Sequence, residues 1–178
     1  GSVDTSSAVS GGTDSGNTSE VTLIGNLVYD CDQAVLAKQG NFYTLLNNTI
    51  VHQTHQGGLD TEGAVVCVGE PGIAEGAGVY LEGNIISDAE ALVRERTNAV
   101  VTFTNNLIHQ LAGNAWSGPG GNNSTNAPLL RYVPQLAETT NFNSWAAAQV
   151  LKDWFGLRSG SPAIGAGPNS RDQGGAIL

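Results

Sequence analysis

The sequence predicts an all-β fold in which short parallel strands stack as successive turns of one coil. Three observations lead to this prediction. A ten-residue pattern occurs four times, and its apolar residues alternate at the period of a β-strand. The composition is typical of turn-rich β proteins, because 24 of the 178 residues are glycine and only 13% are charged. This length suits one compact domain.

Each repeat has two short apolar strands separated by a bend that contains asparagine. The copies are VTLIGNLVYD, YTLLNNTIVH, VYLEGNIISD and VTFTNNLIHQ, and their second bend residues are Asn26, Asn48, Asn84 and Asn106. The residue before each of these asparagines is Gly or Asn, the two types that enter the left-handed region most readily. We therefore expect a two-residue bend that turns the chain through a corner without reversing it.

The repeat spacing indicates how the strands stack. The four asparagines are separated by 22, 36 and 22 residues, and a strand that returns at such a period lies parallel to its earlier copy, about 4.8 Å away. Stacked repeats bring each asparagine above the next, so that their side-chain amides can hydrogen-bond along a buried column. An antiparallel sandwich is the alternative, but its turns would not repeat with the same inward positions.

A third strand is expected after each of the first three repeats, at 33–38, 64–68 and 91–96. In this alignment Val35 and Val93 face the core. The second turn is longer than the first, 36 residues rather than 22, and its extra residues lie on both sides of strand 64–68.

The two ends of the chain have different compositions. Residues 1–20 are rich in Ser, Gly and Thr and are interpreted as a cloning scar followed by a linker or a leftover loop. Residues 21–112 hold the coils. Residues 113–178 form a loop, a helix and an irregular tail of the same domain. The helix is expected within NFNSWAAAQVLKDWFG (141–156), as a cap or flank cover, with Trp145 and Trp154 in the core and sugar stacking as the alternative.

The repeats and three tail segments carry a resemblance to a known family. The segments are NAPLL at 126, FGLRSGSPAIGAG at 155 and RDQGGAIL at 171. Together they resemble the right-handed parallel β-helix of the pectate-lyase-like superfamily, and more specifically the C-terminal part of secreted bacterial β-helix repeat proteins. Gly165 stands where that family usually has Asp, whereas Asp172 and Gly174 match a later pair.

The resemblance implies about four coils of three sheets, an asparagine ladder, and a location outside the bacterial cell or on its surface. In the resembling polysaccharide enzymes the substrate lies along the outer face of one sheet, between loops that interrupt the coils. A lyase also needs cations that neutralise a uronate carboxylate. The candidates for a catalytic role are Lys38, Arg94 and Arg96.

Two further groups of polar residues lie near this sheet. Calcium is the candidate cofactor, since a hard cation prefers converging oxygens, and its candidate ligands are Asp60, Glu62 and Glu70. The candidate substrate-binding residues are His52, His55 and Asp88. For both groups, and for the Arg94-Glu95-Arg96 run, the alternative is a solvated surface whose polar residues pair with one another.

A column of polar residues follows the ladder asparagines by four positions. Asp30, His52, Asp88 and Gln110 occupy it. An Asp-His-Asp stack suits acid–base chemistry, but stacked exposed polar residues more often bind one another and water. The only cysteines, Cys31 and Cys67, fit no metal motif. Two buried thiols are favoured, and a disulfide stays open.

Charge and hydropathy exclude some partners. The net charge of −9 argues against nucleic acid or an anionic membrane, and no apolar run approaches the ~18 residues of a membrane span. Ile24 and Leu46 are expected on an outer flank, where either the C-terminal helix or another chain could cover them, and a coil end is a second place for self-association.

Two functional hypotheses follow. The first is an extracellular carbohydrate-related β-helix, similar to polysaccharide lyases, that binds or cleaves acidic polysaccharide; as an enzyme it would be a lyase or a glycoside hydrolase. The second is a non-catalytic structural, adhesive or assembly module, the C-terminal fragment of a larger surface or secreted protein. The sequence leaves open whether the protein is an enzyme.

Overall fold

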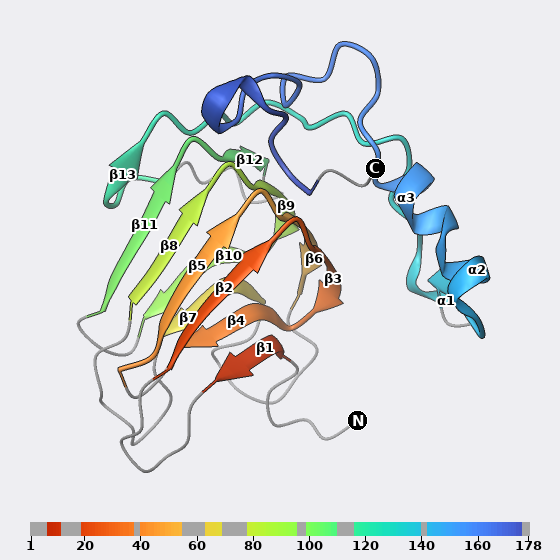
Figure 1. Cartoon of the computed structure of the whole chain (residues 1–178). Coiled ribbons are helices and arrows are strands. Elements are labelled where there is room, and N and C mark those ends of the chain that lie inside the picture. Colours follow the sequence, from red (N-terminus) through yellow and green to blue (C-terminus); the bar gives the residue numbers. More distant parts are fainter. Residues whose placement is uncertain are drawn as a thin grey trace.

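The computed structural model describes residues 7–11, 19–37, 40–54, 63–68, 78–95, 99–109, 116–139 and 142–175. Within them the chain forms three sheets, and all strand pairs in these sheets are parallel (Figure 1). Sheet A contains β1 (Ser7–Gly11), β4 (Gln33–Ala37), β7 (Ala64–Val68) and β10 (Ala91–Glu95). Sheet B contains β2 (Glu20–Ile24), β5 (Phe42–Leu46), β8 (Gly78–Glu82), β11 (Val100–Thr104) and β13 (Gly120–Gly121). Sheet C contains β3 (Leu27–Cys31), β6 (Thr49–Gln53), β9 (Ile85–Ala89) and β12 (Leu107–His109).

The chain visits the sheets in a fixed order, from B to C to A and back to B. Each strand pairs with its counterpart one turn away: Val21 with Tyr43, Tyr43 with Val79, and Val79 with Val101. These registers are the 22-, 36- and 22-residue spacings of the repeats. The prediction of stacked parallel strands is confirmed, and the arrangement is consistent with a parallel β-helix.

The core lies between the three sheets and is built from alternate residues of each strand. Its fully buried members include Tyr43, Leu45, Val66, Leu81, Ile86 and Phe103. The predicted third strands at 33–38, 64–68 and 91–96 agree with β4, β7 and β10, and Val35 is fully buried in the same cluster. At the far end of the stack Trp116 packs on Phe103, with ring centroids 4.6 Å apart.

The bends between sheets B and C explain why Gly or Asn precedes each repeated asparagine. Gly25, Asn47, Gly83 and Asn105 have φ angles between 52° and 68°, in the left-handed region. The asparagine that follows each of them then projects toward the same column. Asn48, Asn84 and Asn106 are at most 1% exposed, and each donates from Nδ2 to Oδ1 of the next asparagine.

That column has a member that the sequence analysis missed. Asn106 Nδ2 donates to Asn123 Oδ1 at 3.1 Å, and Asn123 Nδ2 donates to the Phe103 carbonyl at 2.8 Å. Residues 120–123, GGNN, repeat the bend after only 17 residues, with Asn122 at φ 58°. At the opposite end, β1 pairs with β4, although the composition of residues 1–20 predicted no strand there.

The segment after β13 covers the outer face of sheet C. Leu130 and Phe155 pack on Val51, and Ala163 packs between Ile85 and Leu107. This segment contains α1 (Leu136–Thr139), α2 (Trp145–Ala148), α3 (Val150–Trp154) and the 3-10 helix η1 (Pro168–Ser170). In Figure 1 the α-helices lie beside sheet C. The helical segment predicted at 141–156 is therefore a flank cover.

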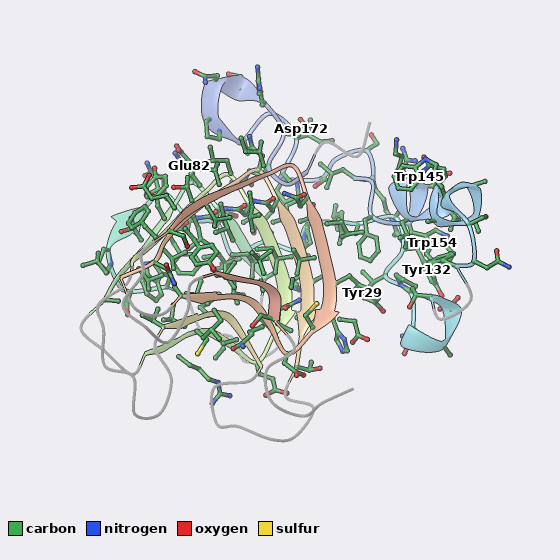
Figure 2. The ribbon with its side chains drawn as sticks, turned by 60° about the horizontal axis from the view of Figure 1, so that its bottom comes forward. Tyr29, Glu82, Tyr132, Trp145, Trp154 and Asp172 are labelled. Atoms are coloured by element: carbon green, nitrogen blue, oxygen red, sulfur yellow. The ribbon has the colours of Figure 1, made fainter. Side chains whose placement is uncertain are left out.

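The prediction for the two tryptophans of this segment is wrong for Trp145. Its side chain is 81% exposed, and no residue of α2 is buried. Trp154 is half-buried and packs edge-on against Tyr132, with centroids 5.4 Å apart. Figure 2 shows Tyr29 projecting from the sheet toward this pair, and its ring lies 5.2 Å from that of Phe155.

The last described residues return to the stacked bends. Gly165 N donates to Asp172 Oδ1 at 2.9 Å, and Gly174 N donates to the Gly83 carbonyl at 2.7 Å. Gly174 has φ 83°, and a Cβ there would lie 2.6 Å from Ile85 Cδ1. Residue 174 therefore has to be glycine for the tail to pack this closely against Ile85.

Candidate functional site

The predicted basic site on sheet A is only partly described. Lys38 and Arg96 lie outside the described residues. Arg94 is on β10, in register with Cys67, and its Nη2 is 3.9 Å from Glu90 Oε2. Both side chains are partly exposed, so the pair resembles a solvated surface contact more than a substrate clamp.

The predicted calcium ligands Asp60, Glu62 and Glu70 also lie outside the described residues, as does His55. In the part of the chain that the structure describes, no group of three or more His, Cys, Asp or Glu side chains is arranged to hold a metal ion. The calcium hypothesis therefore gains no support from the described side chains.

The predicted polar column lies at the corner between sheets C and A. Asp30, His52 and Asp88 all have left-handed φ angles, of 56°, 61° and 57°. Pairing of Val51 with Ser87 and of Gln53 with Ala89 places His52 and Asp88 at equivalent positions. His52 Nδ1 lies 2.6 Å from Asp30 Oδ1, and the imidazole is 43% exposed whereas the aspartate is 8% exposed.

The charges at this corner do not suit an acidic ligand. Asp32 and Glu90 follow Asp30 and Asp88 at the two tight turns, and His52 already contacts one of these carboxylates. A uronate carboxylate placed here would face several groups of its own sign, which costs free energy. The column is therefore a polar, hydrogen-bonded corner and a poor place for an acidic polysaccharide.

Two other groups beside this corner are held neutral. Burial raises the pKa of the Tyr29 hydroxyl, and the nearby Asp30 raises it further. Burial likewise raises the pKa of the Cys31 thiol, with added contributions from Asp30 and Asp32. Because the thiolate is the reactive form, Cys31 is not an activated nucleophile. Cys31 and Cys67 are not joined by a disulfide. Cys67 is buried as predicted, whereas Cys31 is only half-buried.

The structure contains a cavity that the sequence analysis did not find. It has a volume of about 400 Å³ and lies where the C-terminal segment crosses the outer face of sheet C. Sheet C contributes Thr49 and Ile85, and the C-terminal segment contributes the rest, including Leu157, Ile164 and Gln173. The lining thus combines apolar side chains with hydrogen-bonding and charged groups.

Cations are concentrated in the C-terminal segment that forms most of this cavity, whose own lining holds two cations and two carboxylates. Four of the seven Lys and Arg residues lie in 116–175, against three of the 16 acidic residues. Arg131 and Lys152 line the cavity, and both are exposed. Arg131 Nη1 is 3.8 Å from Asp153 Oδ1, a distance that leaves the guanidinium accessible to a second anion.

This cavity could not be predicted from the repeat pattern, because its walls come from segments that are far apart in the sequence, namely two strands of sheet C and the chain from Arg131 onward. The uneven distribution of charge is the signal that could have indicated it. The acidic lining residues are engaged: Asp172 accepts the Gly165 amide and Asp153 lies near Arg131.

None of the helices in the described ranges is long and apolar enough to cross a bilayer. Comparison with known proteins identifies no relative: no family model matches the chain, and no curated protein or solved structure matches it significantly.

Proposed function

We propose that the chain is a right-handed parallel β-helix with an asparagine ladder, related to the pectate-lyase-like superfamily. Three parallel sheets, visited in a fixed order, support this proposal. The hydrogen bonds between stacked asparagines support it further. The tail also supports it, because Gly174 N donates to the carbonyl of the bend residue Gly83, and Asp172 accepts the Gly165 amide within the tail.

We propose that this protein binds a carboxylate-bearing polysaccharide outside the bacterial cell. The observation that carries the proposal is the cavity of about 400 Å³ lined by Arg131 and Lys152, in a chain whose net charge is −9. An arginine fork and an ammonium group are the side chains best suited to a carboxylate. Ile164, whose side chain is exposed, supplies an apolar surface for the C–H face of a sugar ring.

Binding, rather than cleavage, is the activity that the described residues favour. β-Elimination from a uronic acid needs a base within reach of the C5 proton. The two carboxylates of the cavity have other partners, the Gly165 amide for Asp172 and the Arg131 guanidinium for Asp153. The cavity therefore has cations for recognition, and each of its two carboxylates lies close to another group of the protein.

The experiment is a calorimetric titration of the protein at low salt, with oligogalacturonate and with its methyl-esterified form. We expect the acid form to bind and the ester to bind at least tenfold more weakly. Arg131→Gln and Lys152→Gln should each weaken binding several-fold. Arg171→Gln removes the same charge outside the cavity lining and is the matched control.

Equal affinities of Arg131→Gln and Arg171→Gln would contradict the assignment of the cavity. Absorbance of the unsaturated product, measured with pectate and alginate in the presence and absence of calcium, tests the lyase hypothesis directly. Product formation by the unchanged protein would overturn the preference for binding alone.

The second candidate is a non-catalytic structural or assembly module, the C-terminal part of a larger surface or secreted protein. The observation that favours it is the exposed edge of the stack at β2, where Ile24 is 63% exposed. Leu46, its neighbour in β5, is half-buried.

A further inference from the structure

The edge formed by β2 and β3 is less well covered than any inner layer of the stack. Val21 and Leu23 of β2 are only half-buried, whereas their partners Tyr43 and Leu45 in β5 are 0% and 1% exposed. Among the described residues, β2 pairs only with β5 and β3 only with β6. Core side chains and backbone groups of two strands thus face outward at this end.

The asparagine column has a direction, and the direction specifies what fits at this edge. Each inner asparagine accepts two hydrogen bonds at Oδ1, from the backbone N–H and the Nδ2 of the asparagine one turn earlier. For Asn84 the donors are Asn48 N at 2.8 Å and Asn48 Nδ2 at 3.0 Å. Each inner Nδ2 also donates to a strand carbonyl of the earlier turn, as Asn48 does to Leu23 at 2.9 Å.

Asn26 has only half of this pattern. It donates from N and Nδ2 to Asn48 Oδ1, at 2.9 and 3.1 Å. No described residue donates to Asn26 Oδ1, and the second Nδ2 bond turns back to the carbonyl of Ile24 at 3.2 Å. The groups that would complete the pattern are an asparagine and a strand carbonyl of one earlier turn.

Sheet A already extends into that earlier turn. β1 lies beyond β4, so within the described ranges sheet A has one strand more than sheets B and C at this end. Since the chain passes from sheet B to sheet C to sheet A, a complete turn ending in β1 would contain one strand of sheet B beside β2 and one strand of sheet C beside β3.

We propose that the free edges of β2 and β3 bind one further strand–bend–strand segment, parallel to them, with an asparagine at its bend. Its asparagine donates two hydrogen bonds to Asn26 Oδ1, and its apolar residues cover Val21 and Leu23. This is strand addition with a side-chain selectivity that ordinary edge pairing lacks.

A second copy of the chain, stacked end to end, does not fit this edge. At the opposite end of the stack sheet B extends to β13, one strand beyond β12 of sheet C. Suppose that β1 of one copy pairs with β10 of a second copy, and that β3 of the first pairs with β12 of the second. The position that β2 of the first copy would then need in sheet B is already occupied by β13 of the second copy. The occupant is therefore a segment with the sequence pattern of these repeats and not the whole folded chain.

The test uses the full 178-residue protein labelled with ¹⁵N and a synthetic peptide FYTLLNNTIVHQ, the sequence of residues 42–53, with lysines added at one end for solubility. We expect saturable shifts of the backbone amides in β2 and β3 and of the Asn26 side-chain amide. The matched peptide FYTLLNATIVHQ should bind at least tenfold more weakly. In the protein, Asn26→Ala should weaken binding of the first peptide to the same extent, and Asn126→Ala should leave it unchanged.

Both substituted residues are exposed, so the variants should fold. Equal binding of the two peptides, no shifts at β2 and β3 at millimolar peptide, or shifts at the β12–β13 end would each overturn the proposal. Concentration-dependent shifts of β2 without peptide would show that a second copy is the occupant and would also overturn it. Because Arg131 lies in the C-terminal segment and belongs to neither edge strand, Arg131→Gln should not alter peptide binding.

Discussion

The substitution Asn84→Ala removes the central member of the asparagine column. Asn84 is 0% exposed and takes part in four side-chain hydrogen bonds. Its Nδ2 donates to the Leu45 carbonyl at 2.9 Å and to Asn106 Oδ1 at 2.8 Å. Its Oδ1 accepts from N and Nδ2 of Asn48.

The size of the effect follows from the groups left behind. Alanine would leave three buried groups without their partner, namely the backbone N–H and the Nδ2–H of Asn48 and the carbonyl of Leu45. Each buried group without a partner costs about 1–3 kcal/mol, and partial entry of water lowers the sum. We expect Asn84→Ala to reduce the free energy of unfolding by about 4 kcal/mol. Asn26→Ala, at the exposed end of the column, should cost about 1 kcal/mol or less.

The assay is urea unfolding followed by circular dichroism, with both variants and the unchanged protein measured at one pH and salt concentration. A change of midpoint at constant slope reports a change in stability. Equal losses for Asn84→Ala and Asn26→Ala, or a loss below about 1 kcal/mol for Asn84→Ala, would refute the conclusion that burial gives these hydrogen bonds their importance.

Three further predictions concern the bends, the C-terminal segment and the corner thiol. Gly25→Ala and Gly83→Ala both place alanine at φ near 67°, but only at Gly83 would the new Cβ lie 2.3 Å from Asn47 Oδ1. In a urea titration Gly25→Ala should lower the free energy of unfolding by about 1–2 kcal/mol, and Gly83→Ala should lower it by clearly more. Phe155→Ala should cost about 3–5 kcal/mol and Trp145→Ala about 0.5 kcal/mol or less, since the side chains are 2% and 81% exposed; similar losses would contradict the packing of the C-terminal segment on sheet C. The raised pKa of Cys31 predicts that its thiol is labelled more slowly at pH 8 in the folded chain than in urea. It also predicts a contribution to the free energy of unfolding that is present below the ordinary thiol pKa and is lost as the pH rises through the pKa of the folded state. Equal labelling rates in the two states would contradict it.

Much of the fold could be predicted from the sequence because the repeats encode it locally. A Gly or Asn at a left-handed position, an asparagine after it and apolar residues at period two are all short-range signals. They give the register of β2, β5, β8 and β11 without any knowledge of long-range contacts. The place of Asn123 in the column was not predicted, because its bend follows Gly120 and Gly121 and not an apolar strand. β1, with Val9 as its only large apolar residue, resembles linker in composition.

The candidate site could be predicted much less well. His52 and Asp30 do meet, because they occupy the same position in successive repeats. The cavity depends on how the C-terminal segment packs on sheet C, and no repeat or motif encodes that contact. Trp145 shows the same limit, since a helical spacing of apolar residues predicts a buried face but not what covers it.

The most direct test of the account is hydrogen exchange at the asparagine side chains. The Nδ2 protons of Asn48, Asn84 and Asn106 can be followed individually by NMR in deuterated buffer. If parallel turns stack around a buried amide column, the Asn84 side chain should exchange as slowly as the backbone amides of β5 and β8, and the exposed side chain of Asn126 should exchange much faster. Exchange of Asn84 at the rate of Asn126 would contradict the stacked, buried column on which the proposed fold depends.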